Sequence, residues 1–336
     1  MSGMGDAQHL TIDQLRQLRG PLVDVRSPAE FDKGHWPGAI NLPLFSDAER
    51  AEVGTRYKHQ GRLPAIHLGL SSTGPKLSAL AGELERLRDL GTPRLYCWRG
   101  GMRSASMAWL ASQIDLTPTL LIGGYKAYRR WAQEQFERPW PLRLMGGRTG
   151  TGKTDLLLAL QQRGIAIVDL EGLAHHRGSS FGGLGLPPQP STEHYENRLA
   201  ECFDQHRRAG AEAIWLEAES IQVGRCRIPK ALFDQMQNAP VLEIQRSLSE
   251  RVNQLVGVYG HQGMDALAEA TQRISRRLGP QRTTQALNAI AAGDWATACR
   301  ATLDYYARCY DHELERSPQR RSVDISGLSI EQAADQ

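Results

Sequence analysis

The chain has 336 residues, of which 40% are hydrophobic and 23% charged, a composition typical of a globular protein with room for two domains. The formal net charge is only +3, which excludes a surface that is basic throughout, so any basic site for nucleic acid must be local.

The cysteines and the N-terminus indicate the compartment. An odd number of cysteines without a Cys-x-x-Cys pair argues against a zinc ribbon, a dithiol redox site and a disulfide framework. The first residues lack the plan of a secretion signal, and no apolar run approaches the ~20 residues that span a bilayer. We therefore expect a cytoplasmic protein without a membrane segment. The cysteines are Cys97, Cys202, Cys226, Cys299 and Cys309.

The first part of the chain alternates helical and extended patterns. Such alternation predicts a parallel sheet covered on both faces. We expect the Pro- and Gly-rich residues 27–45 to form an ordered loop. The expected helices cover residues 10–20, capped by Thr11, then 77–90, 104–112 and a stretch through Trp131; the expected strands cover residues 21–26, 94–97 and 120–122.

Residues 138–141, Arg-Pro-Trp-Pro, break this pattern and mark a domain boundary. We expect one domain at 10–138 and a second at 141–336, the latter α/β in order with an additional helical region. Residues 178–191, rich in Gly and Pro, resemble a linker. The expected elements of the second domain are strands at 142–145, 165–170 and 213–217, a helix at 155–162, and mainly helical stretches at 247–277 and 295–315.

A lone cysteine, Cys97, leads directly into a glycine-rich turn that contains Arg99 and Arg103. A thiolate is stabilised by backbone amides, a helix N-terminus and nearby cations. The two glycines let the amides turn inward, and a helix is expected to begin near Ser104. The alternative is a buried structural cysteine at the end of a strand, but the microenvironment favours a nucleophile.

Residues 147–154 form a complete G-x-x-x-x-G-K-T phosphate loop between a predicted strand and a predicted helix. Glycines allow backbone amides to wrap phosphate oxygens, the lysine adds a charge, and the threonine hydroxyl can reach Mg²⁺, although the sequence leaves a Mg²⁺ requirement open. The phosphate-binding candidates are Gly147, Gly150, Gly152, Lys153 and Thr154.

Polar residues follow the other strands of the second domain. Asp169 has two alternatives, a metal ligand or the cap of a loop. Residues 175–182 contain adjacent histidines, which point in different directions in most backbones and so do not predict a metal site. Residues 217–220 bring carboxylates toward the phosphate-loop edge of the sheet. Arg177 could help to bind a polar ligand, and Arg225 and Arg227 favour contact with an anion or an RNA backbone.

Residues 24–31 and 34–43 closely resemble the N-terminal signature of rhodanese domains, and Cys97 stands where the sulfur-carrying cysteine of that family is expected. Trp36 replaces an aliphatic residue common in that family, a minor departure. We expect scaffold roles for Asp24, which would bind loop amides, and for Arg26, which would pair nearby.

A rhodanese domain fused to a P-loop domain resembles the tRNA 2-selenouridine synthase family over nearly the whole chain. The resemblance implies an α/β fold: a rhodanese-like domain with a parallel sheet, then a P-loop NTPase-like α/β domain. It implies replacement of sulfur by selenium in 2-thiouridine of the tRNA anticodon loop, with selenophosphate and geranyl diphosphate as co-substrates and no tightly bound cofactor or metal. The segments that carry the resemblance are residues 53–58, 97–104, 147–154, 176–182 and 215–220.

These implications give each loop a role in our hypothesis. Cys97 accepts selenium as a covalent perselenide, which splits one hard step into two easier ones. The amides of residues 98–103, with Arg99 and Arg103, stabilise anionic selenium or the phosphate leaving group. The phosphate loop holds the diphosphate and stabilises the departing anion. Candidates for contact with tRNA or diphosphate are Arg177, Arg225 and Arg227.

Three other functions remain open at this stage. The first is a rhodanese-type sulfurtransferase with a nucleotide-binding domain. The second is a P-loop small-molecule kinase with an N-terminal binding module. The third is a cysteine phosphatase, because Arg103 follows Cys97 by six residues, although Tyr96 stands where such enzymes have histidine. None of them accounts for both loops together.

Overall fold

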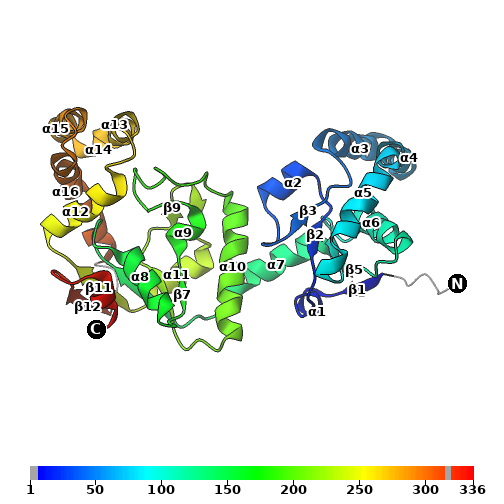
Figure 1. The fold of residues 1–336 in the computed structure, drawn as a ribbon, viewed down its shortest axis with the longest axis horizontal. Helices are drawn as coiled ribbons and strands as arrows, with labels where there is room; N and C mark the ends of the chain where they lie inside the picture. The colour runs from blue at the N-terminus through cyan, green and yellow to red at the C-terminus, as the bar shows by residue number, and fades with distance from the viewer. Residues whose placement is uncertain (1–6, 315–318) are drawn as a thin grey trace. The chain divides into compact units, whose positions relative to one another are not determined.

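The computed structural model describes residues 7–314 and 319–336. The chain divides between Glu134 and Gln135, inside helix α7, into two compact units, here called the N-terminal and C-terminal units. Each unit contains a five-stranded sheet in which every neighbouring pair of strands is parallel, with helices packed on it (Figure 1). The expected α/β class is thus confirmed.

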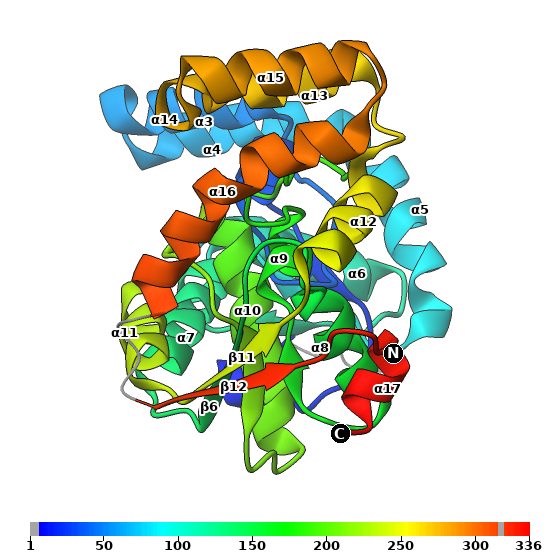
Figure 2. The ribbon, with the colours of Figure 1, turned by 90° about the vertical axis from the view of Figure 1, so that its left-hand side faces the viewer.

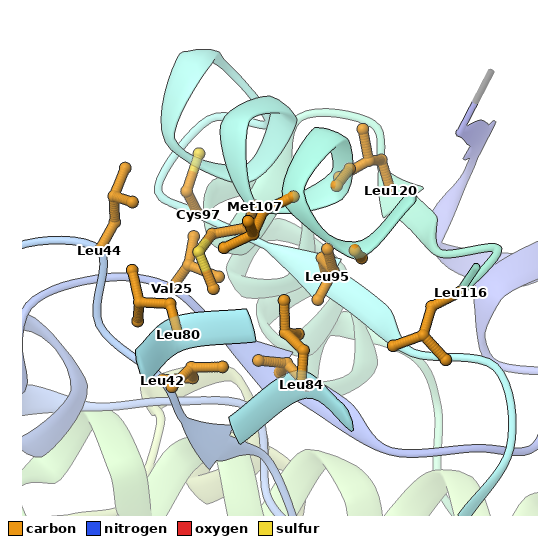
Figure 3. Packing of buried hydrophobic residues seen from close by; sticks show 14 of the residues in the cluster. Val25, Leu42, Leu44, Leu80, Leu84, Leu95, Cys97, Met107, Leu116 and Leu120 are labelled. Carbon is orange, nitrogen blue, oxygen red and sulfur yellow. The ribbon is translucent and has the colours of Figure 1, made fainter. Parts of the chain in front are cut away.

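The sheet of the N-terminal unit has the order β1-β5-β4-β2-β3, so β4 lies in its middle. Apolar side chains of β4, α5 and α6 form one buried cluster against the sheet, which includes Leu95, Leu84 and Met107 (Figure 3). The strands are β1 (Gln8–Leu10), β2 (Leu22–Asp24), β3 (Ile40–Asn41), β4 (Arg94–Tyr96) and β5 (Thr119–Leu121). The helices are α1 (Ile12–Leu15), α2 (Pro28–Lys33), α3 (Asp47–Gln60), α4 (Arg62–Thr73), α5 (Leu77–Arg86), α6 (Met102–Gln113) and α7 (Gly124–Glu137), with 3₁₀ turns η1 (Gly74–Lys76) and η2 (Arg88–Leu90).

The expectation of a loop over residues 27–45 is wrong in part. Helix α2 begins there with Pro28 as its first residue, where the missing amide hydrogen costs nothing, and Ser27 and Glu30 form a capping box. The short strand β3 follows. The α3–α4 hairpin was not expected from the sequence, because α3 has no buried residue and hence no clear apolar stripe.

The sheet of the C-terminal unit has the order β12-β11-β6-β8-β7, and β6 lies in its middle. The expected strand over 165–170 is shorter, because Asp169 caps a helix that begins at Leu170. The strands are β6 (Leu142–Gly146), β7 (Ile167–Val168), β8 (Ile214–Glu217), β11 (Val241–Gln245) and β12 (Arg320–Asp324), and β9 (Gln222–Val223) and β10 (Cys226–Arg227) form a separate antiparallel hairpin.

Helices cover this sheet and extend beyond it. Figures 1 and 2 show α13, α14 and α15 grouped at one end of the unit, away from the sheet, which confirms the expected helical region. This region has a buried cluster of its own, which includes Tyr259, Leu267 and Ile290. The helices are α8 (Lys153–Gln162), α9 (Leu170–Ala174), α10 (Thr192–Arg208), α11 (Lys230–Asn238), α12 (Leu248–Tyr259), α13 (Met264–Arg273), α14 (Ser275–Leu278), α15 (Pro280–Ala291), α16 (Trp295–Leu314) and α17 (Ile330–Ala334).

Within the described ranges, the helices are all too short or too polar to cross a membrane.

A buried ion pair stabilises the loops at the carboxyl end of β2 in the N-terminal sheet. Asp24 at the end of β2 is fully buried and accepts three hydrogen bonds from the guanidinium of Arg26, the shortest at 2.6 Å. Arg26 also donates to the carbonyl of Gly34 at 2.7 Å and lies over the ring of Tyr125, 3.7 Å from its centre. The expected scaffold roles of both residues agree with these contacts.

We expect Asp24→Asn to lower the free energy of unfolding by about 3 kcal/mol, because it leaves the Arg26 guanidinium buried without a counter-charge. Urea unfolding of the full chain, followed by tryptophan fluorescence, measures the change. The control is Asp32→Asn, which alters an exposed carboxylate on α2. Equal stability of the two variants would contradict a stabilising role for the pair.

Candidate active sites

Cys97 lies directly after β4, the middle strand of the N-terminal sheet, and only 4% of its surface is exposed. The amide of Gly101 donates to its Sγ at 3.3 Å, and the Ser104 hydroxyl donates at 3.2 Å. Helix α6 begins at Met102, so its N-terminus also faces the sulfur. The expected turn of amides around the sulfur is therefore present.

Glycine is required in this turn because neighbouring backbone approaches closely. Gly100 has φ 68°, and a Cβ there would lie 2.6 Å from the carbonyl oxygen of Leu121. A Cβ on Gly124 would collide with the carbonyl oxygen of Cys97. The same backbone is tied to α7, since the amide of Tyr125 donates to that oxygen at 2.8 Å.

The electrostatics of the turn favour the thiolate. Burial raises the pKa of the Cys97 thiol, but hydrogen bonds with Ser104 and the charge of Arg103 outweigh it, so the pKa lies below its ordinary value. Arg103 is itself paired with Glu30 at 2.5 Å. The amide of Arg99 also favours the thiolate, while its side chain is exposed. The structure thus brings Cys97 and Arg103 together, and the expected roles of Arg99 and Arg103 stay predictions.

The second loop follows β6, the middle strand of the C-terminal sheet, and opens helix α8. Gly147, Gly150 and Gly152 all have positive φ, and a Cβ on Gly147 would lie 2.6 Å from the carbonyl oxygen of Ile244. Lys153 folds back over the loop, where its Nζ donates to the carbonyl of Gly147 at 2.9 Å. This is the strand–loop–helix context that a phosphate site requires.

Carboxylates lie beside this loop. Asp169 accepts a hydrogen bond from the amide of Gly172 at 2.7 Å and caps α9, which favours the second of its two alternatives. The Thr154 hydroxyl donates instead to Glu171 at 3.1 Å. Burial and the neighbouring Glu219 raise the pKa of Glu171 to about 8, against the opposing effects of Lys153 and Thr154. Such a carboxyl can exchange a proton near neutral pH.

The sequence partly predicted the positions of Glu217 and Glu219 near the phosphate loop, but not that of Glu171. The expected approach of residues 217–220 to the loop agrees with the position of Glu219 and with Glu217, whose pKa is raised by burial and by Asp169 and Glu171. Glu171 was missed because it lies just after the expected strand 165–170, in the first turn of a five-residue helix that the sequence did not predict. The Thr154 hydroxyl could reach Mg²⁺ at this loop.

Two cavities have phosphate-loop residues in their walls. Arg148 and Thr151 line one of about 300 Å³, whose walls also contain three further arginines. Thr149 lines another of about 50 Å³ between α12, α13, α15 and α16, whose other walls are mostly apolar, among them Leu255 and Trp295. The arginines of the first cavity are Arg148, Arg246, Arg251 and Arg320. Sequence reasoning missed Arg246, which follows β11, and Arg251 of α12 at this loop, because arginines at the surface are usually solvated.

The three expected substrate arginines are not all brought together. Arg177 donates to the carbonyl of Leu184 at 3.0 Å, and its charge acts on Asp155 in the first turn of α8, so it lies near the phosphate loop. Arg225 and Arg227 are exposed on the β9–β10 hairpin, where Arg225 bonds with Gln189. Their expected contact with tRNA or diphosphate stays a prediction.

Comparisons with known proteins agree with both halves of the structure. Residues 9–130 match the model of the rhodanese-like domain, and residues 140–334 match the model of the tRNA 2-selenouridine synthase AAA domain. The tRNA 2-selenouridine synthase of Bordetella petrii is 37% identical over 89% of this chain and 88% of its own. Those of Shewanella sediminis (38% identical, 89% of each chain) and Pseudomonas fluorescens (39% identical, 78% of this chain and 76% of its own) are also similar.

We expect Ser104→Ala to raise the pKa of Cys97, because the thiolate loses a hydrogen bond that stabilises it. The rate at which iodoacetamide modifies the Cys97 peptide, followed by mass spectrometry across pH, gives the midpoint. The matched control is Ser112→Ala, since the Ser112 hydroxyl bonds with Trp109 on the same helix and not with the sulfur. An unchanged midpoint in Ser104→Ala would show that this hydrogen bond does not set the pKa.

Glu171 also predicts a pH-dependent stability. Its pKa is raised from 4.5 to about 8 on folding, so the folded state binds the proton more tightly and stability falls as pH rises between these values. Glutamine cannot lose this proton. We therefore expect the stability of Glu171→Gln relative to the wild type, measured by thermal unfolding, to increase from pH 5 to pH 8. The control is Glu212→Gln at an exposed site. A margin independent of pH would contradict the assignment.

Proposed function

The chain belongs to the tRNA 2-selenouridine synthase family, and we propose that it replaces the sulfur of 2-thiouridine at the tRNA wobble position by selenium in two chemical steps. In the first, geranyl diphosphate alkylates the sulfur at the phosphate loop. In the second, selenium from selenophosphate displaces the alkylated sulfur at Cys97. The single observation that carries this proposal is the presence of a thiolate-stabilising loop and a phosphate loop in one chain, each after the middle strand of its sheet.

The alkylation step explains the groups around the phosphate loop. The sulfur forms a bond to C1 of the geranyl group while the C1–O bond breaks and its electron pair leaves with diphosphate. Lys153 and the arginine-lined cavity suit that anion. The apolar cavity at Thr149 suits the alkyl chain, although its 50 Å³ must widen, since a cavity of about 150 Å³ only accommodates a molecule the size of benzene.

Alkylation also requires a base. A 2-thiouridine that gains an alkyl group on sulfur loses the proton on N3, so an acceptor is needed near the reacting base. Glu171 has the pKa for this role, about 8, and lies beside Thr154 of the loop. We assign the proton to this carboxyl within the proposed mechanism.

The second step explains the cysteine loop. The Cys97 thiolate attacks selenium of selenophosphate, the S–Se bond forms, and the P–Se bond breaks with its electron pair kept by phosphorus, which leaves as phosphite. The amide of Gly101 and the charge of Arg103 stabilise the negative charge on the sulfur before this attack. Alkylation has by then converted an inert thiocarbonyl into a thiolate leaving group.

Two variants should separate the steps. In tRNA incubated with geranyl diphosphate and selenophosphate, Lys153→Ala should reduce alkylation at least tenfold, because the loop loses its charge for the leaving diphosphate. Cys97→Ser should leave S-geranyl-2-thiouridine to accumulate and abolish 2-selenouridine. Mass analysis of the nucleosides measures both products, with Cys202→Ser as the control for the loss of a thiol. Normal incorporation of selenium by Cys97→Ser would exclude Cys97 as the carrier.

A further inference from the structure

The N-terminal unit contains an apolar pocket that neither loop accounts for. It lies between the α3–α4 hairpin and the beginning of α6, and its volume is about 560 Å³. We call it the hairpin pocket. Its apolar walls include Leu44, Phe45, Tyr57, Ile66, Leu70 and Met102. Tyr57, Leu70 and Met102 are more than half exposed, which is costly for an enzyme unless something covers them.

The hairpin pocket adjoins the cysteine loop. Met102, Arg103 and Ser106 of its wall belong to the first turns of α6, the helix whose Ser104 donates to the sulfur of Cys97. Its floor residues Leu44 and Phe45 belong to the same buried cluster as Cys97. Figure 3 shows Cys97 and Leu44 together in this cluster. A group bound in the pocket is therefore held next to the loop that carries the nucleophile.

Cations surround the apolar surface. Arg103 and Arg50 face Glu30, at 2.5 Å and 3.6 Å, while Lys58 and Arg62 are exposed. All four of these cations line the pocket. An apolar hollow with a cationic rim suits an apolar group attached to a polyanion, because the group fills the hollow while phosphates approach the rim.

We infer that the hairpin pocket binds the alkyl group of the S-alkylated wobble base while selenium on Cys97 attacks the base. This inference rests on the proposed function and deepens it. The terminal selenium of the Cys97 perselenide forms a bond to C2 of the base. The C2–S bond breaks, and its electron pair leaves with the alkanethiolate, which then takes up a proton. A thiol reductant cleaves the S–Se bond and leaves selenium on C2.

Binding of the alkyl group places C2 of the base at the terminal selenium of the Cys97 perselenide and shields the leaving alkanethiolate from water. It also predicts a substrate preference for this step. An S-methyl base reacts by the same bonds but lacks the chain that fills the pocket. The hairpin pocket should thus distinguish long from short alkyl groups, while the cysteine loop should not.

The test uses full-length protein and anticodon stem-loop RNA that already carries S-geranyl- or S-methyl-2-thiouridine, with selenophosphate and a thiol reductant. We expect Leu70→Asp to lower kcat/KM for the S-geranyl RNA at least tenfold, because a charge enters the apolar wall. The S-methyl RNA should react within about twofold of the wild-type rate. The matched control is Leu63→Asp, because Leu63 lies on the same helix with almost equal exposure (64% against 65%) but outside the pocket.

Three results would overturn the inference, and a fourth would overturn the proposed function. Equal loss of activity on both RNAs, or wild-type activity of Leu70→Asp on the S-geranyl RNA, overturns the inference. So does a change of oligomeric state in light scattering that accompanies the loss, since a second copy would then cover the pocket. Reaction of iodoacetamide with Cys97 at the wild-type rate shows that the loop is intact. If the wild type selenates neither RNA, the proposed function itself fails.

Discussion

Both sites depend on one constraint. At the carboxyl end of the middle strand of each sheet, the turn that follows lies in close contact with neighbouring backbone. The turn after β4 and the turn after β6 each pass so near a neighbouring carbonyl that no Cβ fits at Gly100 or Gly147. In exchange, backbone amides and a helix N-terminus converge on one point. In one turn that point holds a sulfur anion, and in the other it suits a phosphate.

The same constraint explains what the sequence could predict. Both turns have short, contiguous signatures, so Cys97 and Lys153 were identified in their correct strand–turn–helix context from local pattern alone. Glu171 was not, because its place beside Thr154 depends on a helix that begins only two residues after a strand. The hairpin pocket was equally out of reach, since its wall combines α3 and α4, which lack a strong apolar stripe, with the start of α6.

Two apolar cavities, one in each unit, give the account its chemical logic. The alkyl group only converts thiocarbonyl sulfur into a leaving group. The protein must therefore bind this group in both steps, first as the alkyl diphosphate and then as part of the modified base. The cavity at Thr149 adjoins the phosphate loop, and the hairpin pocket adjoins the cysteine loop. The positive side chains near the two loops also differ. Arginines line the polar cavity beside the phosphate loop, whereas arginines and a lysine surround the hairpin pocket.

We expect the two loops to act in sequence and independently. Supplying tRNA that already carries S-geranyl-2-thiouridine to the Lys153→Ala protein, with selenophosphate and a thiol, tests it most directly. We expect 2-selenouridine to form at the wild-type rate, because the only step that needs the phosphate loop has been bypassed. Failure of this protein to selenate the alkylated tRNA, while the wild type does so, would contradict the division of labour between the loops.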